Sequence, residues 1–203
     1  MDVTDEDFRA LADRVREESD AAPECEDLLG TEDAESLAAT LVAPEQPLWA
    51  REIAAFRLGC ARDRRAFETL VLLLNHRDPE RCVAASYALT RLADPRTARA
   101  AAALATNPLR TAYALHPVRL LTALRAPESA PALIETLEGL LAPDAPHWRV
   151  ALACVEGLGT LADPRAAPVL RAALGHPRLS AAAGGALSAL AYRTSGTSTP
   201  ATS

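Results

Sequence analysis

The chain has 203 residues and a net charge of -6 at pH 7, and only 4% of its residues are aromatic. Alanine and leucine are abundant instead, which favours thin helix-on-helix packing over one large globular centre. No run of about 18 apolar residues occurs, and the N-terminus MDVTDEDF is acidic where a signal peptide needs positive charge. We therefore expect a cytoplasmic protein without a membrane span.

Charge is distributed unevenly along the chain. Residues 1–46 carry 15 acidic residues and 3 arginines, a net charge of -12. The remainder carries 12 acidic residues and 18 arginines, a net charge of +6, so the two parts are opposite in sign. All 21 basic residues are arginine, which excludes Schiff-base chemistry on a lysine.

The segment 1–32 is predicted to be an acidic N-terminal extension. Within it, residues 4–18 are predicted to form a helix, with Thr4 as the N-cap and acidic residues in the favourable first turn. One face of this helix is apolar and consists of Phe8, Leu11, Ala12 and Val15. The rest of the segment is broken by proline and glycine and is predicted to be loop, with one short helical piece at 25–29.

Two roles are open for this N-terminal segment. The end units of a helical array must shield a core that has no neighbour, so the helix at 4–18 is expected to cap the helices that follow. Alternatively, the acidic segment folds over an arginine-bearing surface and competes there with an acidic partner.

Residues 33–192 are predicted to form five antiparallel pairs of helices. Apolar residues recur at intervals of three to four, and short turn signals separate the segments. The expected pairs are 33–42 with 48–60, 64–75 with 79–92, 96–106 with 109–124, 129–141 with 147–161, and 165–174 with 178–192. The remaining residues, 193–203, lack apolar periodicity and are predicted to be a disordered tail.

Pro117 falls inside the expected helix 109–124. Because proline lacks a backbone donor and its ring clashes with the preceding turn, it must kink or break this helix. A tolerated kink is one outcome, and a local widening that makes a pocket is the other.

Residues 150–177 hold the clearest copy of a repeated unit. Its turn, LADPR at 161–165, ends one helix and begins the next, because aspartate can accept hydrogen bonds from first-turn amides and proline suits the first helical position. The same five letters occur at 92–96, and weaker copies occur at 61–65 and 125–129. Equivalent alanines follow at steps of 32, 32, 32 and 36 residues, namely Ala34, Ala66, Ala98, Ala130 and Ala166.

These copies resemble HEAT repeats, most closely the short variety of phycobilisome-lyase-type HEAT proteins. The resemblance implies an all-α, right-handed α-solenoid of about five helical hairpins with an N-terminal capping helix. It also implies a non-catalytic scaffold or adaptor that binds a partner protein or peptide on its concave face. The family's Val-Arg pair at the start of the second helix is kept only in part, by Ala50-Arg51.

An enzyme of the HEAT-like class is the alternative. Deoxyhypusine hydroxylases bind di-iron through paired His-Glu motifs, and none of the four histidines here is followed by glutamate. A bilin-lyase-like protein and a DNA-alkylation glycosylase, which binds DNA on a basic concave face, are the other enzymes considered. Cysteines 25, 60, 82 and 154 are widely spaced and form no CxxC motif. No catalytic residue, metal or cofactor is therefore predicted.

The candidate partner-binding surface is a row of equivalent positions in the second helices. Six residues beyond the opening position of each helix stand Phe56, Tyr87, Arg119, Glu156 and Gly185. Aromatic anchors beside charged residues suit a groove for an extended peptide or a partner helix. The alternative is that the two aromatic residues only pack between neighbouring second helices.

Two further residues extend this candidate surface. Glu52 and Arg91 lie one turn away from the row, on the same side of the second helices. We therefore include both among the predicted partner-binding residues.

Overall fold

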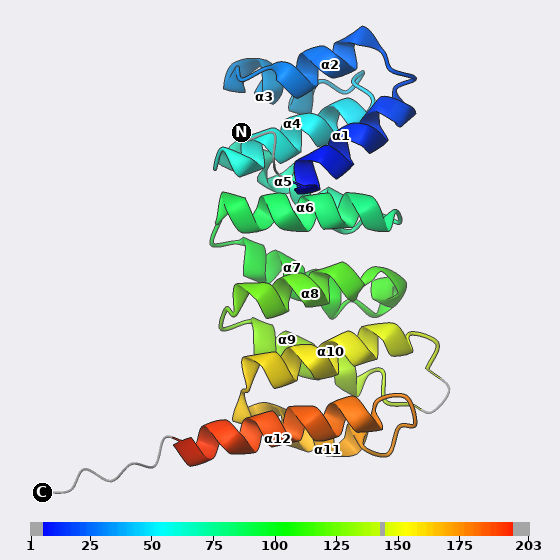
Figure 1. Cartoon of the computed structure of the whole chain (residues 1–203), viewed down its shortest axis with the longest axis vertical. Coiled ribbons are helices and arrows are strands. Elements are labelled where there is room, and N and C mark those ends of the chain that lie inside the picture. Colours follow the sequence, from blue (N-terminus) through cyan, green and yellow to red (C-terminus); the bar gives the residue numbers. More distant parts are fainter. Residues whose placement is uncertain (1–5, 143–144, 197–203) are drawn as a thin grey trace, which may run out of the picture. The chain divides into compact units, whose positions relative to one another are not determined.

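The computed structural model describes residues 6–142 and 145–196, and every regular element within these ranges is a helix (Figure 1). The all-α prediction is thereby confirmed. The predicted N-cap Thr4 lies outside the described residues. No helix of this part of the chain is both long and apolar enough to cross a membrane.

The chain divides into two compact units, Met1–Thr97 and Ala98–Ser203. Unit 1 comprises α1 (Glu6–Glu18), α2 (Pro23–Gly30), α3 (Ala34–Val42), α4 (Leu48–Cys60), the 3-10 helix η1 (Arg64–Ala66), α5 (Phe67–Leu74) and α6 (Pro79–Leu92). The unit boundary lies at the start of α7. Unit 2 comprises α7 (Thr97–Ala105), η2 (Pro108–Tyr113), α8 (Leu115–Leu124), α9 (Ser129–Glu138), α10 (Trp148–Leu161), η3 (Pro164–Ala166), α11 (Ala167–Ala173) and α12 (Ser180–Gly196).

Four of the expected helix pairs are formed, and neighbouring second helices of the same unit contact each other. In unit 1, α3 packs on α4, α5 packs on α6, and α4 packs on α6. In unit 2, α9 packs on α10, α11 packs on α12, and α10 contacts both α8 and α12. The second helices of each unit therefore form a row.

Small residues allow the second helices to approach closely. A Cβ atom added to Gly59 would lie 3.1 Å from the Cβ of Ala88 in the next second helix. A Cβ atom added to Gly159 would lie 3.0 Å from the Cβ of Ala186. The same contact thus recurs in both units, at equivalent positions of the repeat.

Left-handed residues mark the C-terminal ends of four second helices. Arg62, Ala93, Arg125 and Ala162 have φ angles of 63°, 53°, 51° and 53°, and they follow α4, α6, α8 and α10. This conformation ends a helix and is usually adopted by glycine. The left-handed conformation recurs at the same place of successive helix pairs although none of these residues is glycine. The geometry of the repeated turn therefore determines this conformation.

An aspartate caps the next element in three of these turns. The side chains of Asp63, Asp94 and Asp163 accept hydrogen bonds from the backbone N–H two residues later, at 2.9 to 3.0 Å. The arginine at that position also donates its guanidinium group to the same carboxylate. In the fourth turn, the Ser129 hydroxyl accepts from the Ala126 N–H instead. The predicted role of the Asp turn is confirmed.

Pro117 breaks its helix, as predicted. Residues Pro108–Tyr113 form the 3-10 helix η2, and α8 begins only at Leu115. The proline therefore stands in the first turn of α8, where its missing N–H is tolerated.

At the C-terminal end, α12 continues to Gly196, beyond the expected end at 192. The rest of the predicted tail, 197–203, lies outside the described residues.

Candidate functional site

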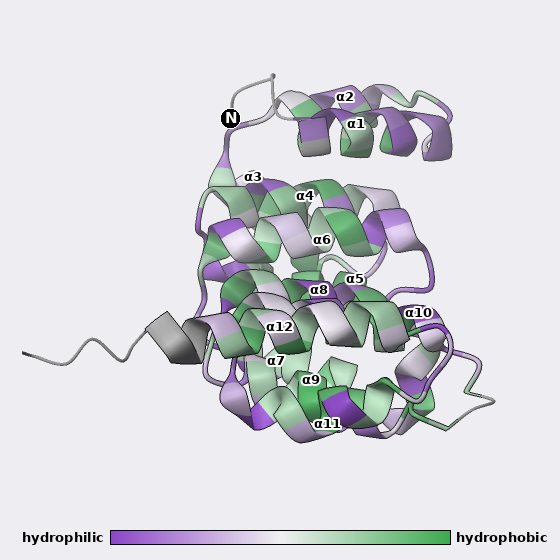
Figure 2. Ribbon diagram, turned by 60° about the horizontal axis from the view of Figure 1, so that its bottom comes forward, coloured by the Kyte–Doolittle hydropathy of each residue, from purple (hydrophilic) through white to green (hydrophobic). Residues whose placement is uncertain are grey.

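Helix α1 lies against the second helices α4 and α6 of unit 1 (Figure 1). Its apolar face is the predicted one, because Leu11, Ala12 and Val15 are buried and Phe8 is half-buried. Hydrophilic residues predominate along the rest of α1 (Figure 2). This helix therefore covers a helix face with its apolar side and turns charged side chains towards solvent.

An aromatic stack joins α1, α4 and α6. The ring centroids of Phe8 and Phe56 are 6.0 Å apart at an interplanar angle of 26°, and those of Phe56 and Tyr87 are 5.7 Å apart at 10°. The Arg57 and Arg91 guanidinium groups each lie 5.9 Å from a ring centroid, that of Phe8 and that of Tyr87 respectively. Stacked rings flanked by cations attract one another beyond simple burial of apolar area.

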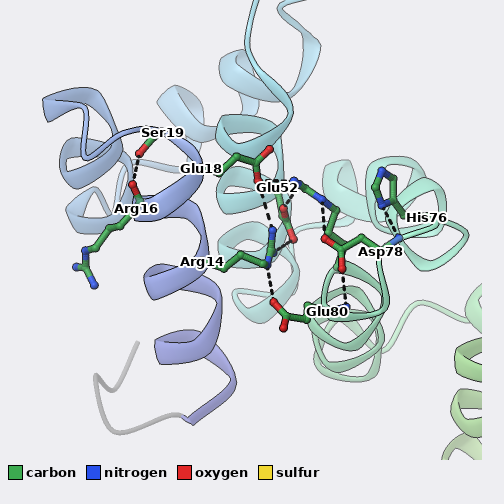
Figure 3. A network of polar contacts seen from close by, with 9 residues as sticks. Arg14, Arg16, Glu18, Ser19, Glu52, His76, Asp78 and Glu80 are labelled. Carbon is green, nitrogen blue, oxygen red and sulfur yellow. Dashed lines mark hydrogen bonds and ion pairs between the residues drawn. The ribbon is translucent and has the colours of Figure 1, made fainter.

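A network of charged side chains joins the same three helices (Figure 3). The Glu52 carboxylate of α4 accepts hydrogen bonds from the guanidinium groups of Arg14 in α1 and Arg81 in α6. Arg81 also donates to Glu18, at the end of α1. Only 1% of the Glu52 side chain and 7% of the Arg81 side chain are exposed, so this ion pair is desolvated.

Burial raises the pKa of the Glu52 carboxyl group above its ordinary value, and the nearby guanidinium groups of Arg14 and Arg81 oppose this rise. The charged carboxylate therefore depends on both arginines, because a buried charge that loses a partner is strongly destabilising. One of these two arginines is supplied by α1.

The contact between α1 and α6 is incomplete. A cavity of about 390 Å³ remains, and its lining includes Ala10 of α1 together with Val83 and Ala84 of α6. Arg14 also lines this cavity, and its Nη1 atom is buried without a hydrogen-bond partner. α1 therefore occupies the face of α4 and α6 without filling it.

Four of the predicted partner-binding residues lie in unit 1, on α4 and α6. Phe56 and Glu52 are buried, and both contact α1. Tyr87 is half-buried on Phe56, and Arg91 is exposed beside the Tyr87 ring. Phe56 and Tyr87 thus pack between neighbouring second helices, which was the alternative prediction for them. Phe56 is also covered by Phe8 of α1.

The other two predicted residues lie in unit 2. Arg119 and Glu156 are exposed on the neighbouring second helices α8 and α10. Gly185, the next position of the row, is exposed on α12. These positions are therefore accessible to a partner in the structure.

Arg14 and Arg81, the two residues that hold Glu52, were not among the residues predicted from the sequence. The available signal was Glu52 itself, which shares a helix stripe with the buried Phe56 and Gly59. A carboxylate on an apolar stripe needs a cationic partner. The sequence did not identify that partner, because Arg14 precedes Glu52 by 38 residues and lies in a separate helix.

The cysteines and turn histidines have structural surroundings. Burial raises the pKa of the Cys82 thiol to about 11 and that of Cys154 to about 12, so both stay protonated at neutral pH. His76 and His176 lie at the predicted turns, where Nδ1 of each accepts a hydrogen bond from the backbone N–H two residues later. In the part of the chain that the structure describes, no three potential metal ligands form a cluster.

No protein-family model matches this chain, and no curated protein gives a significant match to it. Function is therefore inferred from the residues and contacts of the chain itself.

Proposed function

We propose that the chain is a right-handed α-solenoid of HEAT type and acts as a non-catalytic module that binds a partner protein on the face of its second helices. Two recurring features support the repeat: the left-handed helix end before an Asp-capped turn, and the close glycine–alanine contact between second helices. Stacked helical pairs of this kind expose long continuous surfaces that suit protein binding.

The docking of α1 carries the functional part of this proposal. This helix contacts α4 and α6 through an aromatic stack, through an ion pair of Arg14 with the buried Glu52, and through an ion pair of Glu18 with the buried Arg81. Buried aromatic and arginine anchors are also what hold partners together at protein interfaces. A face that binds a helix of its own chain in this way has the chemistry to bind a helix of another protein.

The exposed charges of unit 2 extend the proposal. Arg119 and Glu156 have opposite charges and stand on adjacent second helices. Exposed charges at the edge of an interface orient a partner and raise the association rate more than they add affinity. We assign them this orienting role.

We also propose that the protein works in the reducing cytoplasm. None of the four cysteines forms a disulfide, and Cys25, Cys82 and Cys154 are buried. Proteins of oxidising compartments more often use such residues in disulfides.

Charge reversal in unit 2 tests the proposed binding face. Partner proteins are captured from a lysate of the native host with the wild-type chain and with Arg119→Glu, Glu156→Arg and Arg171→Glu. Arg171 is exposed on the first helix α11 and controls for an unspecific effect of charge. We expect the first two variants to lose proteins that the wild type and R171E retain. Equal capture by all four chains contradicts the proposal.

Small-angle X-ray scattering tests the architecture. A compact chain of 203 residues has a radius of gyration of about 17 Å. An elongated solenoid is expected to exceed that value clearly. A radius at or below it contradicts the solenoid and favours a compact helical bundle.

A further inference from the structure

Three carboxylates lie around the buried centre of the face of α4 and α6. The carboxylates of Glu52 and Asp78 contact Arg81, and Glu80 lies next to them at the start of α6. From α1, Arg14 contacts Glu52 and lies 3.7 Å from Glu80. A helix that docks on this face must therefore bring a cation to a buried carboxylate.

α1 shows the side-chain spacing that this face accepts. Phe8 extends the aromatic stack, while Leu11 and Val15 bury the apolar side of the helix. Arg14 reaches the buried carboxylate of α4, and Glu18, one turn later, pairs with the guanidinium group of α6. The recognised pattern is an aromatic residue, an arginine six positions later and an acidic residue four positions after that.

The link between α1 and α2 is strained. Asp20 and Ala21 both have φ angles of 54°. This left-handed conformation is unfavourable for residues that carry a Cβ atom, and it occurs here in two successive non-glycine residues. If this turn opens when α1 detaches, the unfavourable φ angles are relieved, so Asp20 and Ala21 are where the backbone would change.

The packing between α1 and α6 leaves a space that a helix with larger apolar side chains could fill. The cavity beside Ala10 measures about 390 Å³, and Val83 on its opposite wall remains 45% exposed. A helix with a larger apolar side chain at the position of Ala10 fills this space. It gains van der Waals contacts that α1 does not make.

We propose that α1 is an exchangeable occupant of this face and that the partner is an amphipathic helix with the aromatic-to-arginine spacing of Phe8 and Arg14. The partner displaces α1, which moves away about Asp20 and Ala21. Its arginine then replaces Arg14 on Glu52. This inference rests on the proposed function, because it names the class of partner and the element that controls access.

Exchange of α1 is measured on the full chain. The double variant Phe8→Ala/Arg14→Ala weakens the docking of α1 and replaces no residue of α4 or α6. The probe is a fluorescein-labelled synthetic peptide with the sequence of residues 4–19, and its binding is followed by fluorescence anisotropy. We expect the double variant to bind the peptide about tenfold more tightly than the wild type, because its own α1 competes less.

Two further comparisons test specificity. A peptide with alanine in place of Phe8 and Arg14 should bind both chains weakly, and addition of Tyr87→Ala to the double variant should weaken binding of the original peptide about tenfold. In the wild type, Ala21→Gly relaxes the strained turn and holds α1 in place more firmly. We expect this variant to bind the peptide severalfold more weakly than the wild type.

Equal binding of the peptide by the wild type and the double variant overturns the proposal. Equal affinity for the original peptide and for the peptide with alanine in place of Phe8 and Arg14 also overturns it. Light scattering that shows a dimer with α1 exchanged between copies also overturns it, since the occupant is then a second copy. Circular dichroism checks the fold of the double variant.

Hydrogen exchange on the wild type gives a second measurement that needs no variant. The amides of α1 should exchange faster than those of α4 and α6, because a detachable helix opens without global unfolding. Equal protection of the three helices overturns the proposal. Neither measurement involves Arg119 or Glu156, so a failure here is distinguishable from a failure of the proposed function.

Discussion

The second-helix faces of the two units differ in what lies on them. In unit 1, the face of α4 and α6 carries stacked aromatic rings and buried ion pairs, and α1 covers it. In unit 2, the equivalent positions on α8 and α10 are the exposed Arg119 and Glu156. One repeat therefore supports both a surface that holds a helix and a surface open to solvent. The side chains at equivalent positions contribute to this difference.

One pair of equivalent positions shows this difference most clearly. Glu52 stands two residues after the opening position of its second helix, and the half-buried Leu152 stands at the same place in α10. The leucine side chain needs no polar partner, whereas the buried carboxylate needs cations from two other helices. Burial of the Glu52 carboxylate therefore costs desolvation free energy in unit 1, and Leu152 in unit 2 has no such cost. The ion pair with Arg14 in turn fixes the position of α1 on this face.

Removal of Arg81 should have the largest effect on stability. In Arg81→Met, the buried carboxylate of Glu52 keeps only Arg14, so the unfolding free energy should fall by about 3 to 5 kcal/mol. The control Arg119→Met changes an exposed arginine of unit 2 and should shift it by less than about 0.5 kcal/mol. Urea denaturation at pH 7 measures both variants. Similar small losses would show that the buried network contributes little to unit 1.

Glycine-to-alanine substitutions in unit 2 should have the next largest effect. A Cβ atom at Gly157 would lie 2.4 Å from Thr122 Oγ1 and 2.6 Å from Leu133 Cδ2, so Gly157→Ala should lose about 1 to 3 kcal/mol. Gly184 has no neighbouring atom within 4 Å of an added Cβ, and Gly184→Ala should gain about 1 kcal/mol from helix propensity. Thermal denaturation gives the sign of each change. A gain in stability for both variants would mean that the close helix contact at Gly157 does not stabilise unit 2.

The helices could be predicted from the sequence because their start and stop signals are local. Asp94 and Asp163 cap the turns that the LADPR motif indicates. Pro117 interrupts the expected helix 109–124, as its missing backbone donor predicted. The end of α12 was missed because no apolar period defines residues 193–196. A weak local signal leaves a helix boundary open by several residues.

The candidate site could be predicted only in part. Repeat register placed Phe56 and Tyr87 next to each other on α4 and α6, and the structure brings them into contact. The seating of α1 on them depends on contacts between residues far apart in the sequence, such as Phe8 with Phe56 and Arg14 with Glu52. Periodicity identifies an apolar helix face, but it does not identify the surface that covers that face.

Glycine at the left-handed helix ends should stabilise both units to a similar, smaller extent. Ala93 ends α6 and Ala162 ends α10, each with a φ angle of 53°. Ala93→Gly and Ala162→Gly remove the clash of Cβ in this conformation and should each gain roughly 0.5 to 1 kcal/mol. Differential scanning calorimetry measures the gain. A gain in one unit only would show that the two units do not share the same turn energetics.

Acid sensitivity should show the smallest difference between the units. Hydrogen bonds from Arg96 and Arg165 hold the pKa values of Asp94 and Asp163 below the ordinary value of 3.8. Because these pKa values are depressed in the folded chain, the stabilisation is complete above the ordinary value. It is lost as the pH falls through the folded-state pKa.

Substitution by asparagine separates the charge of these residues from their capping role. Asp94→Asn and Asp163→Asn keep a capping oxygen but do not titrate. Both should flatten the fall in unfolding free energy between about pH 5 and pH 2, measured by urea denaturation. The effect should be larger for Asp94, whose side chain is 2% exposed, than for Asp163, which is 20% exposed. Unchanged slopes would assign the acid sensitivity to other carboxylates, and a larger effect in D163N would mean that burial does not set the strength of this turn.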